Sequence, residues 1–514
     1  MGGTCSQPAE PEHTDECALR TAPHREHAPS AAVHLPPGKL LEPIRSETTE
    51  QLASHEAWWE ALSKGSRNRV WEQLKEVTPL PPAPTRPTAV GDLVQLSGVP
   101  GQPAIDGKGA KVLSLGTTNE LELELEGEDR RRLWAPASSA TLLPTFPEIG
   151  VSLAFLREFC VEHKDYLRDK STNEVCDLII KPLCASAQSS LAELVQRVER
   201  KSMCSQKPFT GKATLFVSHA RQHNFLRLIN ALEAHILSLP ESEGVFVWLD
   251  VFVMNQYKSA DTPKPAIWWT EILREAIGSI GNSCLVLSSW DVLTPLSRTW
   301  CLWELACVAQ TGATLNVALG SADSARFEQA LREDFETTAS SLSRIDIRHA
   351  QACLESDKKK ILEVAESTVG LSKLNDQVLH LMRGWLVKAG KKALIKLPEQ
   401  QRGTSRTLFY LARLLKQQGQ LVESEALWRE CVAARRREFG ARNQRTLAAT
   451  GCLAMVLRER GNLDEAESLY QANVTIEREM LGVRHPTTLV SMNNLASLLQ
   501  DRGKLDDAEE LQRE

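Results

Sequence analysis

The chain has 514 residues, of which 25% are charged, and its formal net charge is -6 at pH 7. This length predicts about three domains, and the small net charge does not favour nucleic acid or another polyanion as a partner. The 12 cysteines form no CxxC pair and no metal-ligand spacing, so we expect reduced thiols in a cytoplasmic protein and neither a metal ion nor a cofactor. No long apolar run occurs in the sequence, which argues against a membrane-spanning helix.

The first residues carry a signal for lipid attachment. Positions 1–6 fit the N-myristoylation pattern, with Gly2 as the acceptor and Ser6 at the required place. Cys5 is placed to receive a palmitate, and two acyl chains hold a membrane far better than one. A chance match is the alternative. Residues 1–48 are rich in Pro, His and Ser without periodicity, which predicts a disordered tail and, if it is acylated, peripheral membrane attachment.

Residues 49–145 are predicted to hold a short helical segment and a small all-β domain. Residues 49–78 have a helical pattern of apolar residues that ends at the proline-rich stretch 79–84. Within residues 88–145, apolar and polar residues alternate strictly, and glycine-containing turns separate the alternating segments. These short strands favour a small β-barrel. Their order resembles Src-homology-type (SH3-like) or KOW-like barrels, which implies a docking or spacing role.

Residues 150–205 are predicted to form a helical lead-in, and residues 212–370 an α/β domain. The second region alternates apolar strands with amphipathic helices, which is typical of a parallel sheet with helices on both faces. In such a sheet, ligands bind at the carboxyl ends of the strands. The predicted strands are residues 213–217, 245–250, 284–288, 314–319 and 345–347.

Three segments of this region stand at strand ends or on the helix after the third strand. One strand ends at Ser218, which His219 follows; the next ends at Asp250; and a helical segment carries Trp300 and Glu304. In this order the segments resemble the three conserved boxes of Toll/interleukin-receptor/resistance (TIR) domains. The resemblance implies a flavodoxin-like fold. It also implies a catalytic role for Glu304, because the third-box glutamate is catalytic in the members that cleave NAD.

The resemblance assigns Ser218, His219, Asp250 and Trp300 to the binding of NAD as a substrate. Cleavage of the nicotinamide glycosidic bond develops positive charge on the ribose, and a carboxylate such as that of Glu304 can stabilise this charge. The alternative is a structural Glu304 in a non-enzymatic domain, since many TIR-like domains only associate with their own kind.

The C-terminal region repeats with a period of 42 residues. After a predicted helical linker, 371–403, Leu-Ala pairs begin at positions 411, 453 and 495, and glycines stand at 419, 461 and 503. Each glycine is expected to end a helix in the left-handed conformation, so that helical hairpins stack into an α-solenoid over residues 404–514. The pattern resembles tetratricopeptide repeats (TPR) of the kinesin-light-chain type. In that family the positions of Asn493 and Asn494 line a peptide groove.

The expected architecture is multidomain, α/β plus all-α, and two functions stay open. One is an intracellular signalling adaptor that binds protein or peptide partners through its TPR repeats and cleaves NAD to nicotinamide and ADP-ribose with its TIR-like domain. The other is a non-enzymatic scaffold or cargo adaptor of the kinesin-light-chain type. The lack of a heptad pattern before the repeats argues against the second. Position 514 falls inside a helix of the third copy, so we expect the repeat array to be incomplete.

Overall fold

The computed structural model describes residues 74–77, 87–106, 108–117, 119–125, 131–143, 145–202, 205–257, 265, 268–287, 294–333, 335, 339, 345–352 and 355–513. The chain divides into two compact units, one of Glu47–Leu427 and one that contains Trp428–Glu514. The acylation signal, the tail at 1–48 and most of the helical segment predicted at 49–78 lie outside the described residues. Of that segment only the 3-10 turn η1 (Leu74–Glu76) is described.

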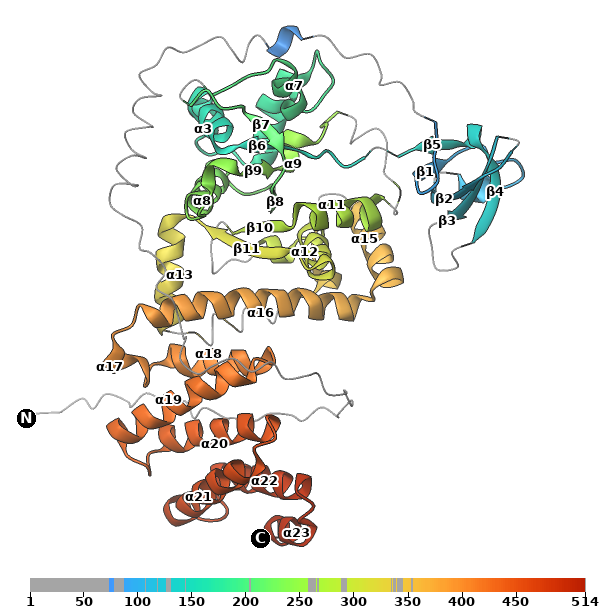
Figure 1. Cartoon of the computed structure of the whole chain (residues 1–514). Helices are drawn as coiled ribbons and strands as arrows, with labels where there is room; N and C mark the ends of the chain where they lie inside the picture. Colours follow the sequence, from blue (N-terminus) through green and yellow to red (C-terminus); the bar gives the residue numbers. More distant parts are fainter. Residues whose placement is uncertain are drawn as a thin grey trace, which may run out of the picture. The chain divides into compact units, whose positions relative to one another are not determined.

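The first unit contains a five-stranded antiparallel sheet in the order β4-β3-β2-β1-β5 (Figure 1). In β3, Leu121, Leu123 and Leu125 are buried while the glutamates between them are not, so the period-two pattern is confirmed. Because β4 and β5 are the two ends of the pairing order, closure into a barrel stays a prediction. The elements are β1 (Leu93–Leu96), η2 (Pro103–Ile105), β2 (Gly109–Leu115), β3 (Glu120–Leu125), β4 (Arg132–Pro136), η3 (Ala137–Ser139) and β5 (Ala140–Leu142).

The predicted helical lead-in has its three helical segments and is flanked by two strands that were not predicted. Ser171 and Ser190 each begin a helix with a capping box, in which the serine and a glutamate three residues later satisfy backbone N–H groups. The first strand, β6, pairs with β9 of the following domain, so the lead-in extends the main sheet. The elements are β6 (Ile149–Ser152), α3 (Leu153–Glu162), α4 (Lys164–Leu167), α5 (Thr172–Val175), η4 (Cys176–Ile180), α6 (Lys181–Cys184), α7 (Leu191–Arg197) and β7 (Thr210–Lys212).

The main sheet has six strands in the order β11-β10-β8-β9-β6-β7 (Figure 1). All four residues of β8 are buried, as expected for a parallel strand covered on both faces. In chain order the first parallel strand, β8, lies between the second, β9, and the third, β10. Open α/β sheets bind ligands at the carboxyl ends of the strands where the strand order reverses in this way. The parallel strands are β8 (Leu215–Ser218), β9 (Phe246–Trp248), β10 (Asn282–Leu287) and β11 (Thr314–Leu319).

Helices connect these strands, as the alternating pattern predicts. They are α8 (Phe225–Leu237), η5 (Ser242–Gly244), α9 (Asp250–Val253), η6 (Trp268–Ile272), α11 (Leu273–Ile280), η7 (Thr294–Ser297), α12 (Thr299–Thr311), α13 (Ser321–Glu333), η9 (Ile347–His349) and α15 (Glu355–Thr368). The prediction of a strand at 345–347 is wrong. There the Asp346 carboxylate accepts the backbone N–H of Arg348 and the side-chain amide of Asn375, and these bonds fix the 3-10 turn η9 in place of a ladder.

Helices alone make up the rest of the described chain. The predicted linker is dominated by one helix of 25 residues, α16, which packs against α12 and α18. Gly461 and Gly503 follow α20 and α22 with φ of 82° and 74°, which confirms their predicted left-handed conformation. None of the described helices has the length and apolar character needed to span a membrane. The helices are α16 (Leu371–Ile395), α17 (Glu399–Arg402), α18 (Arg406–Gln417), α19 (Leu421–Phe439), α20 (Gln444–Glu459), α21 (Leu463–Leu481), α22 (Pro486–Asp501) and α23 (Leu505–Arg513).

Gly211 in β7 offers a test of the packing at the sheet edge. A Cβ atom at this position would lie 2.7 Å from the ring of Phe246. We expect Gly211→Ala to lower the free energy of unfolding by about 1–3 kcal/mol, because the ring must move within a packed edge. Gly244→Ala is the matched control, since a Cβ there meets nothing within 4 Å. Calorimetry of the full chain measures both, and equal shifts for the two variants would contradict the packing argument.

Candidate functional site

Ser218 and Glu304 meet at the carboxyl ends of the parallel strands. Ser218 is the last residue of β8, and Glu304 lies in the second turn of α12. The Ser218 hydroxyl donates a hydrogen bond of 2.6 Å to Oε2 of Glu304. These two residues, 86 positions apart in the sequence, were both predicted as site residues, and the structure places them in direct contact.

The start of α12 is fixed by backbone hydrogen bonds to a distant segment. The backbone N–H of Thr299 donates to the carbonyl of Gln351 at 3.0 Å, and the N–H of Gln351 donates to the carbonyl of Ser297 at 2.8 Å. Thr299 has no exposed surface, so this contact lies inside the domain. The two bonds position the first turn of the helix and therefore the carboxyl group one turn further on.

The Glu304 carboxyl group holds its proton more tightly than an ordinary glutamate. Although part of the residue reaches the surface, the carboxyl is desolvated, and burial is the main cause that raises its pKa to about 8. The charge of Asp250 raises the pKa further, while the Ser218 hydrogen bond and the charge of Arg221 lower it. At neutral pH, most of the Glu304 carboxyl is therefore protonated.

Asp250 has the opposite electrostatic state, because it forms an ion pair with Arg221. A guanidinium nitrogen of Arg221 lies 2.6 Å from Oδ2 of Asp250, and the backbone N–H of Val251 donates to Oδ1 at 2.7 Å. Burial opposes ionisation of Asp250, but the charge of Arg221 and these hydrogen bonds outweigh it, so its pKa is lowered. Sequence analysis missed Arg221; its only signal was a basic residue three positions after the strand-end serine.

His219 is buried rather than open to a substrate. Its side chain is 5% exposed, and its Nε2 lies 3.8 Å from Oδ1 of Asp250. Burial is the main cause that lowers the His219 pKa to about 4, so the imidazole is neutral at pH 7. Cys301 of α12 donates its Sγ–H to the His219 carbonyl at 3.3 Å. His219 therefore belongs to the wall of the site.

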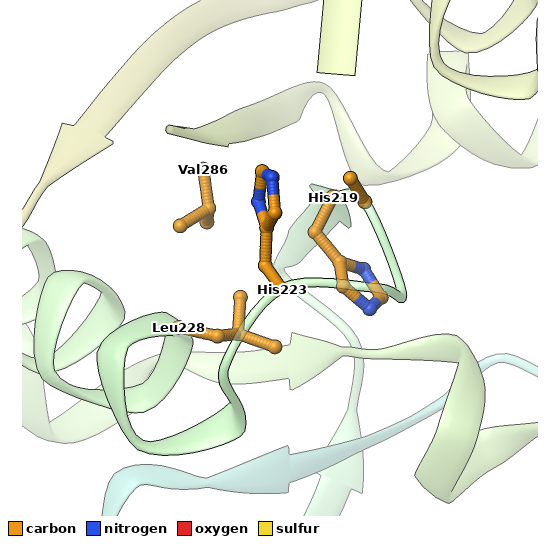
Figure 2. Close-up of a pocket in the computed structure, with 5 residues that line it drawn as sticks. His219, His223, Leu228 and Val286 are labelled. Atoms are coloured by element: carbon orange, nitrogen blue, oxygen red, sulfur yellow. The ribbon is translucent and has the colours of Figure 1, made fainter. Parts of the chain in front are cut away.

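A small pocket lies beside this wall. Figure 2 shows His219 and His223 next to Leu228 of α8 and Val286 of β10. The pocket has a volume of about 10 Å³, which is room for roughly one water molecule. In the described residues no group of three or more His, Cys, Asp or Glu side chains has the arrangement of a metal site. A nucleotide can enter this pocket only if the surrounding side chains move.

Trp300 stands in the first turn of α12 and is half-buried. It precedes Glu304 by one helical turn, so the two side chains leave the helix on the same face. The neighbouring Trp303 is 2% exposed and belongs to the core. The predicted role of Trp300 as a wall of the binding site stays a prediction.

The lead-in helices hold the loops that carry the site, a role that the sequence did not reveal. The backbone N–H of Asn173 donates to the carbonyl of Arg221 at 3.0 Å, in the loop after β8. The side-chain amide of Asn255 donates to the carbonyl of Gln188 at 2.7 Å, in the segment after α9. Residues far before the α/β domain thus set the geometry of the Arg221–Asp250 pair.

The second unit presents a separate candidate surface on α20 and α22. Asn493 is exposed and Asn494 half-buried on α22. The positions 42 residues earlier, on α20, are Gly451 and Cys452, both half-buried. The predicted asparagine pair therefore lies at the surface of α22, and α20 offers no amides at the same register.

Buried polar contacts join the hairpins of this unit. Asn473 of α21 is 3% exposed and donates its side-chain amide to the carbonyl of Leu447 of α20 at 2.8 Å. Glu467 of α21 accepts hydrogen bonds from Arg502 at 2.6 Å and Lys504 at 2.8 Å. The Glu467 contacts tie one hairpin to the turn of the next, which fixes how α20 and α22 lie relative to each other.

Comparison with known proteins assigns the C-terminal region. Two family models, both described as tetratricopeptide repeat, match residues 404–444 and 445–514. No curated protein matches the chain. One similar solved structure is of TPR-like repeats from a Podosopora anserina protein whose description names a kinesin light chain. Its sequence is 21% identical to this chain, the TM-score is 0.25, and the match covers 42% of this chain and 93% of that one. BtubC (BKLC) from P. vanneervenii is 16% identical, with a TM-score of 0.24, covering 42% of this chain and 78% of that one. Residues 404–514 are therefore tetratricopeptide repeats.

The raised pKa of Glu304 predicts a pH-dependent stability. An ordinary glutamate has a pKa of 4.5, and the folded-state value is about 8. Between these values the unfolded chain releases the proton and the folded chain keeps it, so stability falls as pH rises, by at most about 1.4 kcal/mol per pH unit. Above the folded-state pKa, the contribution of Glu304 to the free energy of unfolding no longer changes with pH. Glu304→Gln, which keeps an acceptor for Ser218 but cannot ionise, should lack this slope.

Denaturant unfolding of the full chain at a series of pH values measures the effect. The quantity to compare is the difference in unfolding free energy between the native chain and Glu304→Gln, which cancels all other titrating groups. A difference that does not change with pH would show that Glu304 has an ordinary pKa.

Proposed function

We propose that this chain is a protein-binding adaptor whose tetratricopeptide repeats hold a peptide segment of a partner. The observation that carries the proposal is the family match over residues 404–514. Stacked helical hairpins of this kind present a continuous groove, and their general role is to bind other proteins. The resemblance of the 42-residue period to the kinesin-light-chain type supports a cargo or scaffold role of the same class.

The outward faces of α20 and α22 support peptide recognition. Asn493 and Asn494 provide amides, which both donate and accept hydrogen bonds and so match the backbone of an extended peptide. Gly451 has no side chain, and Cys452 is small, so α20 leaves room where α22 offers polar groups. Small residues beside amides suit a groove that takes a peptide backbone close to the helices.

A selection from a random peptide library on the full chain tests this proposal. We expect enriched peptides whose affinity falls about 5–20-fold in Asn494→Ala, the cost of one or two lost hydrogen bonds to a peptide backbone. Thr475→Ala is the matched control, because Thr475 is exposed on α21 and its hydroxyl donates to the carbonyl of Gln471, one turn earlier on the same helix. If no peptide is enriched, or if both variants bind equally well, the groove proposal fails.

The Ser218–Glu304 contact favours a second function, cleavage of NAD by a TIR-like domain. It places a carboxyl group at the carboxyl ends of parallel strands, where α/β folds bind ligands. In this proposal Glu304 stabilises the positive charge that develops on the ribose as nicotinamide leaves. Partner binding to the repeats would bring copies of the α/β domain together, and acylation of Gly2 would hold the protein at the cytoplasmic face of a membrane.

This chemistry needs the ionised form of Glu304, so the rate of NAD cleavage should depend on pH. With a pKa of about 8, only about a tenth of the carboxyl is ionised at pH 7. We expect nicotinamide release by the full chain, crowded on beads, to rise up to tenfold between pH 7 and 9 and to vanish in Glu304→Gln. Release that persists in this variant, or no release from the native protein at any pH, would leave Glu304 a structural residue.

A further inference from the structure

The outward face of the small antiparallel sheet exposes a tryptophan. Trp134 lies in β4, which is at one end of the strand order, and 52% of its surface is accessible. Its neighbours Leu133 and Ala135 point the other way and are buried, so the strand keeps its alternation and is well anchored. Tryptophan combines a large apolar ring with a polar N–H group and is enriched at interfaces, so this position is a candidate for contact with another molecule.

A glycine on the sheet makes room for the indole ring of Trp134. A Cβ atom at Gly116 would lie 3.0 Å from Cζ3 of Trp134 and 3.5 Å from Cβ of Glu120. The ring therefore extends from β4 across β3 to the turn that follows β2. The glycine is what allows this close approach. About half of the Trp134 surface stays accessible to solvent, and we call this exposed ring the Trp134 platform.

The residues around this platform are acidic. In the register of the sheet, Glu122 stands directly opposite Trp134, and Glu120 stands opposite Pro136, the next outward residue of β4. Ser114 donates its hydroxyl to Glu122 at 2.7 Å, which positions that carboxylate. The two carboxylates and the indole share one end of the sheet face.

The other end of the same face has a different charge. Glu124 pairs in register with Arg132 on β4 and with Lys111 on β2, so two basic residues flank that carboxylate. Negative charge on this face is thus concentrated at Trp134.

We infer that this face binds an extended, arginine-bearing segment of a protein partner, with one guanidinium stacked on Trp134 and directed at the carboxylates of Glu122 and Glu120. A guanidinium is planar, stacks on indole rings and pairs with carboxylates, so it matches both features of the surface. The position of β4 at the end of the sheet supports an extended partner. A strand added along β4 places every second side chain on the outward face, beside Trp134.

The experiment uses a fluorescein-labelled peptide with arginine at every second position and threonine between. A control peptide has citrulline in place of each arginine, which keeps the shape of the side chain and removes its charge. Fluorescence anisotropy with the full chain measures binding of both. We expect the arginine peptide to bind about tenfold more tightly than the citrulline peptide, and its affinity to fall as salt is added.

Three variants locate the binding to this face. Trp134→Leu and Glu122→Gln change surface side chains, and each should weaken binding of the arginine peptide about 3–5-fold. Arg132→Gln is the control, because Arg132 also lies on β4 but carries a positive charge. This charge repels the arginine peptide, so its removal should leave the binding unchanged or make it tighter. Circular dichroism confirms that each variant is folded.

The inference is overturned by any of three results. The first is equal binding of the arginine and citrulline peptides, or no binding of either. The second is an unchanged affinity in both Trp134→Leu and Glu122→Gln, which would place the peptide elsewhere on the chain. The third is weaker binding in Arg132→Gln, because loss of a positive charge cannot weaken the attraction of a cation.

Discussion

The ion pair between Arg221 and Asp250 joins the loops that follow two neighbouring parallel strands, and the arrangement of the candidate site depends on it. The pair holds the residues after β8 against those after β9. The lead-in region holds both loops from the outside, through Asn173 and Gln188. Burial is the main cause that raises the pKa of the nearby Glu304 carboxyl group; the charge of Asp250 adds to this effect, and the charge of Arg221 opposes it. The pair therefore holds the two loops together and makes a smaller contribution to the charge state of Glu304.

The main elements of the fold follow from the sequence because they rest on periodicity. The alternation of apolar and polar residues identified β3, and the wholly apolar run ending at Ser218 identified β8. Spacing of glycines at 42 residues identified the helix ends in the repeats. The segment at 345–347 has the alternating apolar residues of a strand but does not form one. Its conformation is set by Asp346 and by Asn375, a side chain nearly thirty positions away.

The candidate site was accessible to sequence reasoning only in part. Ser218 and Glu304 lie at strand and helix positions that the alternating pattern could locate, and the structure brings them into contact. Whether a residue at such a position meets solvent depends on packing, and His219 proved to be buried. Arg221 and the lead-in contacts could not be found, since they join segments without a local pattern. Charge states are likewise a property of the assembled structure.

The unequal faces of α20 and α22 have a consequence for the orientation of a bound chain. Amides at Asn493 and Asn494 stand at one end of the surface, and the small residues Gly451 and Cys452 occupy the same register one hairpin earlier. A groove with identical repeats would let a peptide slide by one repeat or bind in reverse. Here the two ends are chemically distinct, and Glu467 keeps the hairpins in fixed alignment. A bound peptide would therefore have one chain direction and one register relative to the repeats.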